Sequence, residues 1–194
     1  MAVQGAEVEL DRTVFFAFSG GQESDHGTIA GLAVQGAVLD GQRIRYTLPD
    51  DHGLAVGQNV VVEIDWSRRY ALMRLHFAAE LVLEMTCAAL PGVERIRAHI
   101  VQDKARIDFA WHESLSSLLP SVEERVDAIV RADLPMRSAF SDPIAGRRYW
   151  EVDGVARVPC GGTHLRRTGE VGRVVLKRRN PGKEKERVEI QLAT

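Results

Sequence analysis

The chain has 194 residues, of which 45% are hydrophobic and 27% are charged, and its formal net charge at pH 7 is −2. These fractions are typical of a globular protein, and the length is sufficient for one domain or two small ones with a buried core. No uncharged apolar run reaches about 18 residues, which excludes a membrane-spanning helix, and the acidic residues Glu7, Glu9 and Asp11 argue against a signal peptide.

Residues 1–65 alternate short β-prone runs with turn residues. Several short strands at this spacing predict a small antiparallel β-barrel, with a boundary to the next domain near Asp65. The β-prone runs are Thr13–Phe18, Thr28–Val34, Ala37–Leu39, Arg43–Leu48 and Asn59–Asp65.

A long helix is predicted to follow, beginning after Asp65 or Ser67 and ending near Leu90, where Pro91-Gly92 stops it. Helical spacing places several apolar side chains on one face. We interpret Cys87 as a small buried hydrophobic residue of this face. The face comprises Leu72, Leu75, Ala79, Val82, Leu83 and Cys87.

Residues 66–194 predict a two-layer α+β domain, so the fold class is α+β. Two strands, a helix, a further strand and a C-terminal hairpin follow the long helix. The hairpin loop, 180–186, is charged, and we expect it to be mobile. The expected elements are strands Arg95–Val101 and Ala105–Ala110, helix Val122–Ala132, strand Arg148–Val158, and hairpin strands Gly172–Lys177 and Arg187–Leu192.

A cysteine and a histidine stand four residues apart in Cys160-Gly161-Gly162-Thr163-His164. Thiolate sulfur and imidazole nitrogen are ligands that zinc prefers, and the two glycines allow unusual backbone torsions that would bring them to one ion. The alternative is a loop that carries both residues by chance. Cys87 and Cys160 are the only cysteines, and so few favour a cytosolic protein, with a disulfide between them possible but not indicated.

Two ligands cannot complete a tetrahedral site, and His76 and Glu80 are the best further donors. They are four residues apart, on one face of the predicted long helix. We therefore predict a zinc site formed by His76, Glu80, Cys160 and His164. A lone helical histidine is more often structural, and Glu80 could instead act as a base, orient an imidazole, or pair with Arg69 or Arg74.

The loop from Ser19 to Thr28 contains Gly20, Gly21 and Gln22. Glycines let a substrate approach the main chain, although many hairpin turns have the same composition. His26 could serve as a metal ligand or an acid–base group, but a solvated loop histidine is the favoured interpretation. The arginines at the helix start, Arg68, Arg69 and Arg74, could contact phosphates or pair with Glu63 and Asp65.

Charge is unevenly distributed. Residues 147–187 contain 12 Lys or Arg against 5 Asp or Glu, so the rest of the chain is acidic. A basic C-terminal third is compatible with a polyanionic partner and also with a simple solvated hairpin. The basic residues that could contact such a partner are Arg166, Arg167, Lys177, Arg178 and Arg179.

With these motifs in this order, the chain resembles the AlaX proteins, which are free-standing relatives of the alanyl-tRNA synthetase editing domain, and more distantly the editing module of threonyl-tRNA synthetase. The resemblance implies the fold of an editing domain over residues 66–194, metal ligands at His76, Cys160 and His164, and a glycine-rich loop at Gly20, Gly21 and Gln22. The segments that carry it are Thr13–Ile29, Gly57–Val82, Lys104–Phe109 and Pro159–Gly172.

The resemblance implies a cytoplasmic, zinc-dependent hydrolase that deacylates mischarged tRNA, chiefly seryl- or glycyl-tRNA for alanine, with the loop amides stabilising the oxyanion. Glu80 stands where the family has a second histidine, and His26 and Phe77 also depart from the family pattern. Two alternatives therefore stay open: a tRNA-binding module without turnover, and a metal hydrolase of small amino-acid esters.

Overall fold

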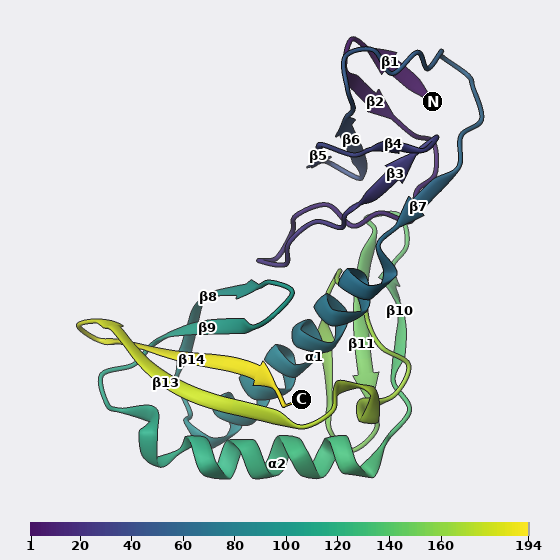
Figure 1. Ribbon diagram of the computed structural model, residues 1–194. Coiled ribbons are helices and arrows are strands. Elements are labelled where there is room, and N and C mark those ends of the chain that lie inside the picture. Colours follow the sequence, from purple (N-terminus) through teal and green to yellow (C-terminus); the bar gives the residue numbers. More distant parts are fainter. Residues whose placement is uncertain (194) are drawn as a thin grey trace. The chain divides into compact units, whose positions relative to one another are not determined.

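The computed structural model describes residues 1–193, and the chain divides into two compact units. One unit comprises Met1–Ser19 and Glu23–Tyr70, and the other comprises Gly20–Gln22 and Ala71–Thr194. The tip of the glycine-rich loop thus belongs to the C-terminal unit, and the boundary between the units falls inside the long helix. Figure 1 shows the strands of the N-terminal unit in purple and blue.

Two antiparallel sheets form the N-terminal unit. They enclose a small core of Val8, Phe15, Ile29, Tyr46 and Leu48. The antiparallel strands confirm the prediction for this region, whereas closure of the sheets into a barrel stays a prediction. One sheet has the order β1 (Ala2–Gln4), β2 (Glu7–Glu9), β6 (Arg43–Thr47), β5 (Gly36–Asp40), and the other has the order β4 (Leu32–Ala33), β3 (Gly27–Ile29), β7 (Val62–Ile64).

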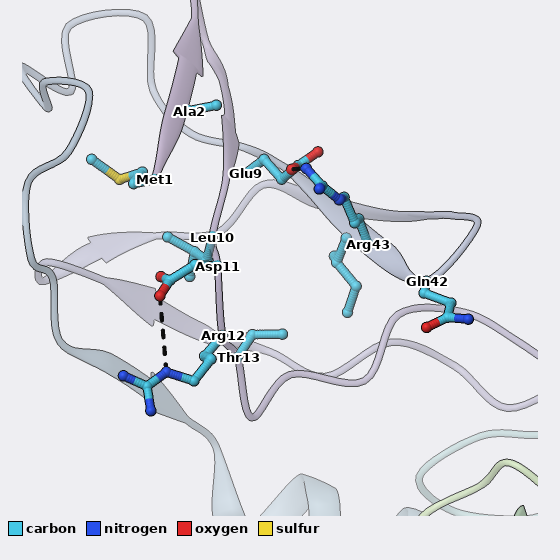
Figure 2. A pocket seen from close by; sticks show the side chains of 10 residues that line it. Met1, Ala2, Glu9, Leu10, Asp11, Arg12, Thr13, Gln42 and Arg43 are labelled. Carbon is cyan, nitrogen blue, oxygen red and sulfur yellow. Dashed lines mark hydrogen bonds and ion pairs between the residues drawn. The ribbon is translucent and has the colours of Figure 1, made fainter. Parts of the chain in front are cut away.

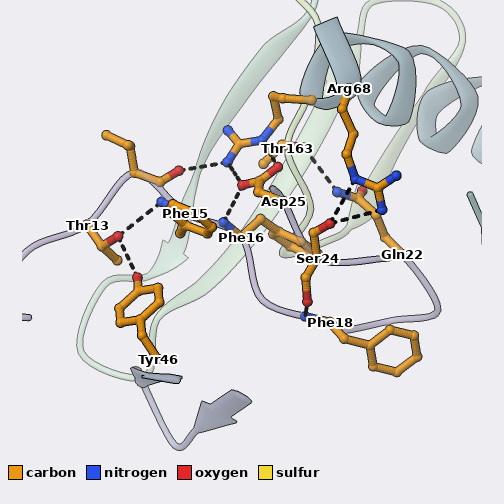
Figure 3. Close-up of polar contacts among 12 residues, drawn as sticks. Thr13, Phe15, Phe16, Phe18, Gln22, Ser24, Asp25, Tyr46, Arg68 and Thr163 are labelled. Atoms are coloured by element: carbon orange, nitrogen blue, oxygen red, sulfur yellow. Dashed lines mark hydrogen bonds and ion pairs between the residues drawn. The ribbon is translucent and has the colours of Figure 1, made fainter. Parts of the chain in front are cut away.

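The predicted strand at Thr13–Phe18 is wrong, because these residues form no regular strand. Side-chain oxygens accept hydrogen bonds from main-chain amides that would otherwise pair with a neighbouring strand. The Phe15 amide donates to Thr13 Oγ1 at 3.1 Å, the Phe16 amide to Asp25 Oδ2 at 2.6 Å, and the Phe18 amide to Ser24 Oγ at 2.8 Å (Figure 3). The segment is therefore held as an extended loop.

The C-terminal unit contains two antiparallel sheets and two α-helices, which confirms the α+β class for this part. The helices are α1 (Trp66–Ala89), which begins in the N-terminal unit, and α2 (Leu119–Ala132), and 3₁₀ turns lie at Leu115–Ser117 and Thr168–Val171. The larger sheet has the order β13 (Val174–Gly182), β14 (Lys185–Leu192), β9 (Ala105–Ala110), β8 (Glu94–Ile100). The smaller sheet has the order β10 (Arg137–Asp142), β11 (Arg147–Val152), β12 (Ala156–Pro159).

Helix α2 protects an edge of the larger sheet. Strand β13 lies at that edge, and two of its amides donate to carboxylates of α2: Leu176 to Glu123 at 2.9 Å and Val174 to Asp127 at 3.4 Å. Without these partners, the amides of the edge strand could form hydrogen bonds with a strand of another chain. Figure 1 shows α2 running beside β13.

Helix α1 has the bounds that the sequence predicted, but it is buried on more than one face. Asp65 caps it by accepting the Arg68 amide at 3.0 Å, and the helix ends before Pro91. Phe77 lies outside the predicted apolar face, yet it is fully buried and packs edge-to-face on Trp150 of β11, with ring centroids 5.1 Å apart. Cys87 is exposed, contrary to prediction, because Met85 and Thr86 take the inward positions of the last turn.

The C-terminal hairpin is longer than predicted. Most of the segment expected as a mobile loop extends β13 and β14, and Gly182 pairs with Lys185 around a tight turn. Ion pairs across the strands, Arg178 with Glu186 and Arg179 with Glu189, hold this extension together. Within residues 1–193, no helix is both long enough and apolar enough to cross a membrane.

Candidate metal centre

Four side chains from two distant segments converge in the C-terminal unit. His76 and Glu80 lie one turn apart on α1, while Cys160 and His164 follow the end of β12. One possible ligand atom from each of the four lies within 4.8 Å of all the others. The convergence that the predicted zinc site requires is therefore present.

The separations between these atoms fit a tetrahedral metal site. His76 Nε2 lies 3.2 Å from Cys160 Sγ and 3.5 Å from Glu80 Oε1, and His164 Nε2 lies 3.8 Å from Glu80 Oε2. A tetrahedron with zinc bonds of about 2.0–2.3 Å has edges of about 3.3–3.8 Å. Glu80 Oε2 and His164 Nε2 are buried without a hydrogen-bond partner, as expected of atoms that a cation would satisfy. The residues thus suit a soft divalent ion.

Burial and mutual charge set the electrostatics of the cluster. Burial, followed by the Glu80 carboxylate, raises the pKa of the Cys160 thiol to about 12. Burial also lowers the pKa of His164 to about 4, and His76 and Arg148 add to this effect. Burial alone would raise the pKa of Glu80, but hydrogen bonds and charges from His76, Cys160 and His164 together lower it. The cluster therefore contains the Glu80 carboxylate beside a thiol and an imidazole, Cys160 and His164, whose neutral forms are favoured by burial.

Gly162 is required by a close approach between the loop and α1. A Cβ atom at Gly162 would lie 2.6 Å from His76 Cε1 and 3.3 Å from Cys160 Sγ, whereas a Cβ at Gly161 would meet nothing within 4 Å. Neither residue has a positive φ, so the prediction that this pair supplies unusual torsions is wrong. The missing side chain of Gly162 is what lets the His76 ring reach Cys160.

Two residues that the sequence analysis missed support His164. Ser138 Oγ on β10 lies 3.3 Å from His164 Nδ1, which leaves Nε2 directed at Glu80. Arg148 on β11 donates to Ser138 Oγ at 3.0 Å and to the Gly162 carbonyl at 3.3 Å. Contacts of this kind fix the ring orientation of a ligating histidine. No motif in the sequence signals them, because they depend on the pairing of β10 with β11.

The glycine-rich loop reaches the ligand loop through Gln22. Gln22 is fully buried, and its Nε2 lies 3.5 Å from Oγ1 of Thr163, which stands between Cys160 and His164 (Figure 3). Its Oε1 atom is buried without a partner and could accept a hydrogen bond from a ligand. Gly20 and Gly21 both have positive φ, and a Cβ at Gly21 would lie 2.2 Å from the Ala98 carbonyl oxygen. Glycine is thus required to seat this loop against β8.

Other predicted residues lie outside the cluster. His26 is exposed and is not one of the converging groups, which agrees with the favoured solvated interpretation. Arg68 pairs with Glu23 at 2.8 Å, and Arg69 pairs with buried Asp25, which are carboxylates other than the Glu63 and Asp65 that the sequence suggested. In the C-terminal unit, Arg74 donates to the Val171 carbonyl at 2.9 and 3.0 Å instead of to a carboxylate.

Several of the basic residues predicted to contact a polyanion already have carboxylate partners. Arg167 pairs with Asp133 at 2.7 Å, Arg178 with Glu186 and Arg179 with Glu189. Lys177 donates to Gln191 at 3.1 Å, and Arg166 is exposed. Much of the positive charge of this hairpin is therefore balanced locally.

A cavity of about 750 Å³ in the N-terminal unit offers less chemistry. Its wall carries charged residues, but Glu9 pairs with Arg43, and Asp11 lies 3.8 Å from Arg12. Figure 2 shows these side chains around the cavity together with Met1, Leu10 and Gln42. Since the converging donors of the described residues lie in the other unit, we place the functional site there.

Comparison with known proteins shows what this chain is similar to. Residues 152–189 match the model of the threonyl and alanyl tRNA synthetase second additional domain. The chain is 28% identical to the alanyl-tRNA editing protein AlaX-M of Pyrococcus horikoshii, an alignment that covers 99% of the chain and 89% of that protein. The chain is thus similar, over nearly its whole length, to an alanyl-tRNA editing protein, and it contains a segment similar to the editing domain of the synthetases.

The chain is also similar to part of much longer proteins, the alanine–tRNA ligases. The ligase of Bifidobacterium longum is 32% identical over 87% of the chain, and that of Bordetella petrii is 34% identical over 88%. In both cases the chain spans only 22% of the ligase. The editing-domain family model includes Cys160 and His164, whereas His76, Glu80 and Gln22 lie outside the matched residues.

Proposed function

We propose that this chain is a zinc-dependent hydrolase that deacylates mischarged tRNA, most readily tRNA for alanine that carries serine or glycine. The observation that carries the proposal is the convergence of His76, Glu80, Cys160 and His164 within 4.8 Å in an editing-domain homologue. The alignment with an alanyl-tRNA editing protein over nearly the whole chain supports tRNA as the partner.

The donor set supports zinc as the ion. One sulfur and two imidazole nitrogens are ligands that zinc prefers, and a carboxylate oxygen is a competent fourth ligand. When bound, zinc would supply a Lewis acid that polarises the ester or positions the amino group or hydroxyl of the substrate. Ser138 and Arg148 would keep His164 in its ligating orientation.

The glycine-rich loop would complete the site for an aminoacyl ester. The orphan Oε1 atom of Gln22 can accept a hydrogen bond from the amino group or hydroxyl of a bound amino acid, while Thr163 holds the other end of the amide. The main-chain amides of Gly20 and Gly21 can donate to the oxygen that becomes negative as water adds to the ester carbonyl.

Glu80 is the residue at which this chain differs from the pattern that the resemblance implies. Its Oε1 faces His76 and its Oε2 faces His164, so the carboxylate lies inside the ligand cluster. We therefore assign Glu80 as the fourth ligand, in the place of an imidazole. The extra negative charge would make the ion a weaker Lewis acid, so we expect slower hydrolysis than from a site with three imidazoles.

The test is hydrolysis of seryl-, glycyl- and alanyl-tRNA for alanine by the purified, zinc-loaded protein. We expect release of serine or glycine in preference to alanine, and a loss of at least about a hundredfold in kcat/KM for Cys160→Ala. Cys87→Ala is the matched control, because Cys87 is the other cysteine and is exposed outside the cluster.

The outcomes separate the competing functions. Binding of tRNA without ester loss at high enzyme concentration would instead identify a module without turnover. Hydrolysis of free amino-acid esters but not of aminoacyl-tRNA would identify a small-ester hydrolase. Equal activity in Cys160→Ala and Cys87→Ala would refute the metal centre as the catalytic site.

A further inference from the structure

A row of three side chains leads across the smaller sheet away from the metal centre. Phe140 on β10 pairs with Arg148 on β11, and the Cys160 amide donates to the Arg148 carbonyl at 2.9 Å at the end of β12. Directly paired residues of antiparallel strands present their side chains on the same face. The row therefore begins at a metal-site residue and ends at Phe140 on the edge strand.

A cavity of about 420 Å³ adjoins this row. Ser141, Arg147 and Arg148 line it on the side of β10 and β11, while Cys160 and Gly161 line it on the side of the ligand loop. The cavity and the metal centre thus share Cys160. A β-bulge between Phe140 and Asp142 shifts the register beside the cavity, and bulges of this kind often re-aim side chains next to functional sites.

The two arginines of this cavity form no ion pair among residues 1–193, although Asp142 on β10 is the cross-strand partner of Arg147. Arg147 is exposed, and Arg148 gives its hydrogen bonds to the neutral Ser138 hydroxyl and Gly162 carbonyl. Among residues 1–193, no carboxylate lies within ion-pair distance of either guanidinium, in contrast to Arg178 and Arg179 on the hairpin. Two uncompensated guanidinium groups are suited to a phosphate, which arginine binds through several donors at once.

Phe140 does not line this cavity itself, but it supplies a flat apolar surface beside Arg148, which does. Its side chain is 55% exposed although it lies beside the site, and the Arg148 guanidinium carbon lies 5.7 Å from the centroid of its ring. Exposed aromatic rings beside cationic groups are the usual means by which proteins bind unpaired bases. The ring stacks on a base and the cations pair with the adjoining phosphate.

We propose that Phe140, Arg147 and Arg148 form the docking site for the single-stranded 3′ end of tRNA. This inference rests on the proposed function, because the aminoacyl ester sits on the terminal ribose and must reach the metal centre. Two strand spacings of about 4.8 Å separate Phe140 from Cys160, a span that a few nucleotides bridge. A nucleotide that precedes the esterified one stacks on Phe140, and its phosphate pairs with Arg148. Arg147 is the next residue of β11 and projects from the opposite face of the strand, but it lines the same cavity and pairs with the adjoining phosphate.

The first test measures binding of a fluorescent single-stranded RNA that ends in CCA to the zinc-loaded protein. Phe140→Leu removes the ring but keeps an apolar side chain, and we expect Kd to rise at least about fivefold. Arg147→Gln should raise Kd by a similar factor and reduce the slope of log Kd against log salt concentration by about 0.7.

The control is Arg173→Gln, which removes one exposed charge from the same unit away from this cavity. A Kd unchanged by Phe140→Leu, or a loss in Arg147→Gln no greater than in Arg173→Gln, would overturn the proposal.

A second measurement separates this inference from the proposed function. In hydrolysis of a seryl minihelix, Phe140→Leu and Arg147→Gln should raise KM about fivefold or more, while zinc content and hydrolysis of serine ethyl ester stay at wild-type values. If the wild type hydrolyses the minihelix but these variants keep its KM, the docking site is wrong and the proposed function stands. If the wild type shows no hydrolysis but RNA binding still depends on the row, the docking site stands and the proposed function fails.

Discussion

At the scale of single residues, the candidate metal centre requires a residue without a side chain at position 162. The backbone there lies so close to the His76 ring that a methyl group would overlap it, and Gly162 does not have the positive φ that would by itself favour glycine. Space, and not conformational freedom, therefore explains the glycine. This distinction separates Gly162 from its neighbour Gly161, whose Cα faces open space.

Substitution of these two glycines tests that explanation. Gly162→Ala should lower zinc affinity by at least about tenfold, because a ligand displaced by more than about 0.2 Å leaves its bonding distance. Gly161→Ala should bind zinc as the wild type does. Competition with a chromophoric chelator measures both affinities, and equal affinities of the two variants would contradict the assigned role of Gly162.

Glu80 gives the second test at this scale. Because imidazole is a ligand that zinc prefers and histidine at this position keeps the i, i+4 spacing from His76, Glu80→His should bind zinc at least as tightly as the wild type. Glu80→Ala should bind it less tightly, since one ligand is lost. A large loss of zinc in Glu80→His, measured by metal analysis after dialysis, would mean that the carboxylate holds a geometry that imidazole cannot supply.

At the scale of elements, a buried carboxylate joins three strands of the larger sheet. Asp108 on β9 is 3% exposed and pairs in register with Arg97 on β8 and Arg187 on β14. Hydrogen bonds from Arg187 outweigh the effect of burial and, with those from Arg97, lower the pKa of Asp108 from its ordinary 3.8 to about 2. The folded state therefore binds the proton less readily than the unfolded state, so ionised Asp108 stabilises the fold.

The pH dependence of stability follows from this shift. The contribution of Asp108 is fully present well above pH 3.8 and is lost as the pH falls through about 2. At pH 7, Asp108→Asn should reduce the free energy of unfolding by roughly 1–3 kcal/mol, as expected for lost charge-assisted hydrogen bonds. The difference from the wild type, measured by urea unfolding, should shrink between pH 5 and pH 2. A difference that is constant over this range would show that ionisation of Asp108 plays no part.

The bounds of a helix or strand could be predicted from the sequence where neighbouring residues in the chain determine them. Helix α1 has a capping carboxylate at Asp65 and a Pro-Gly stop, both visible in the sequence, and its bounds were predicted well. The segment Thr13–Phe18 has the composition of a strand, but Ser24 and Asp25 take its amides, and composition does not reveal such partners. Ser138 and Arg148 were missed for a related reason, since strand register brings them to His164.

At the scale of the whole molecule, the ligand cluster draws its members from positions 76–80 and 160–164, which are far apart in the chain. Donor chemistry and helical spacing were sufficient to propose all four residues from the sequence alone. The same approach failed for Cys87, whose apolar neighbours suggested burial although the packing of α1 leaves it exposed. Several metal donors at compatible spacings have few uses other than a shared ion. A single cysteine among apolar residues, in contrast, can be either buried or exposed.

X-ray absorption at the zinc edge of the purified protein is the decisive experiment for the metal centre, because it counts the ligands on the ion. We expect about one zinc per chain, with one sulfur at about 2.3 Å and three nitrogen or oxygen ligands at about 2.0–2.2 Å, and loss of the sulfur contribution in Cys160→Ala. A protein without zinc after metal-replete purification, or a zinc with no sulfur ligand, would contradict the assigned metal centre.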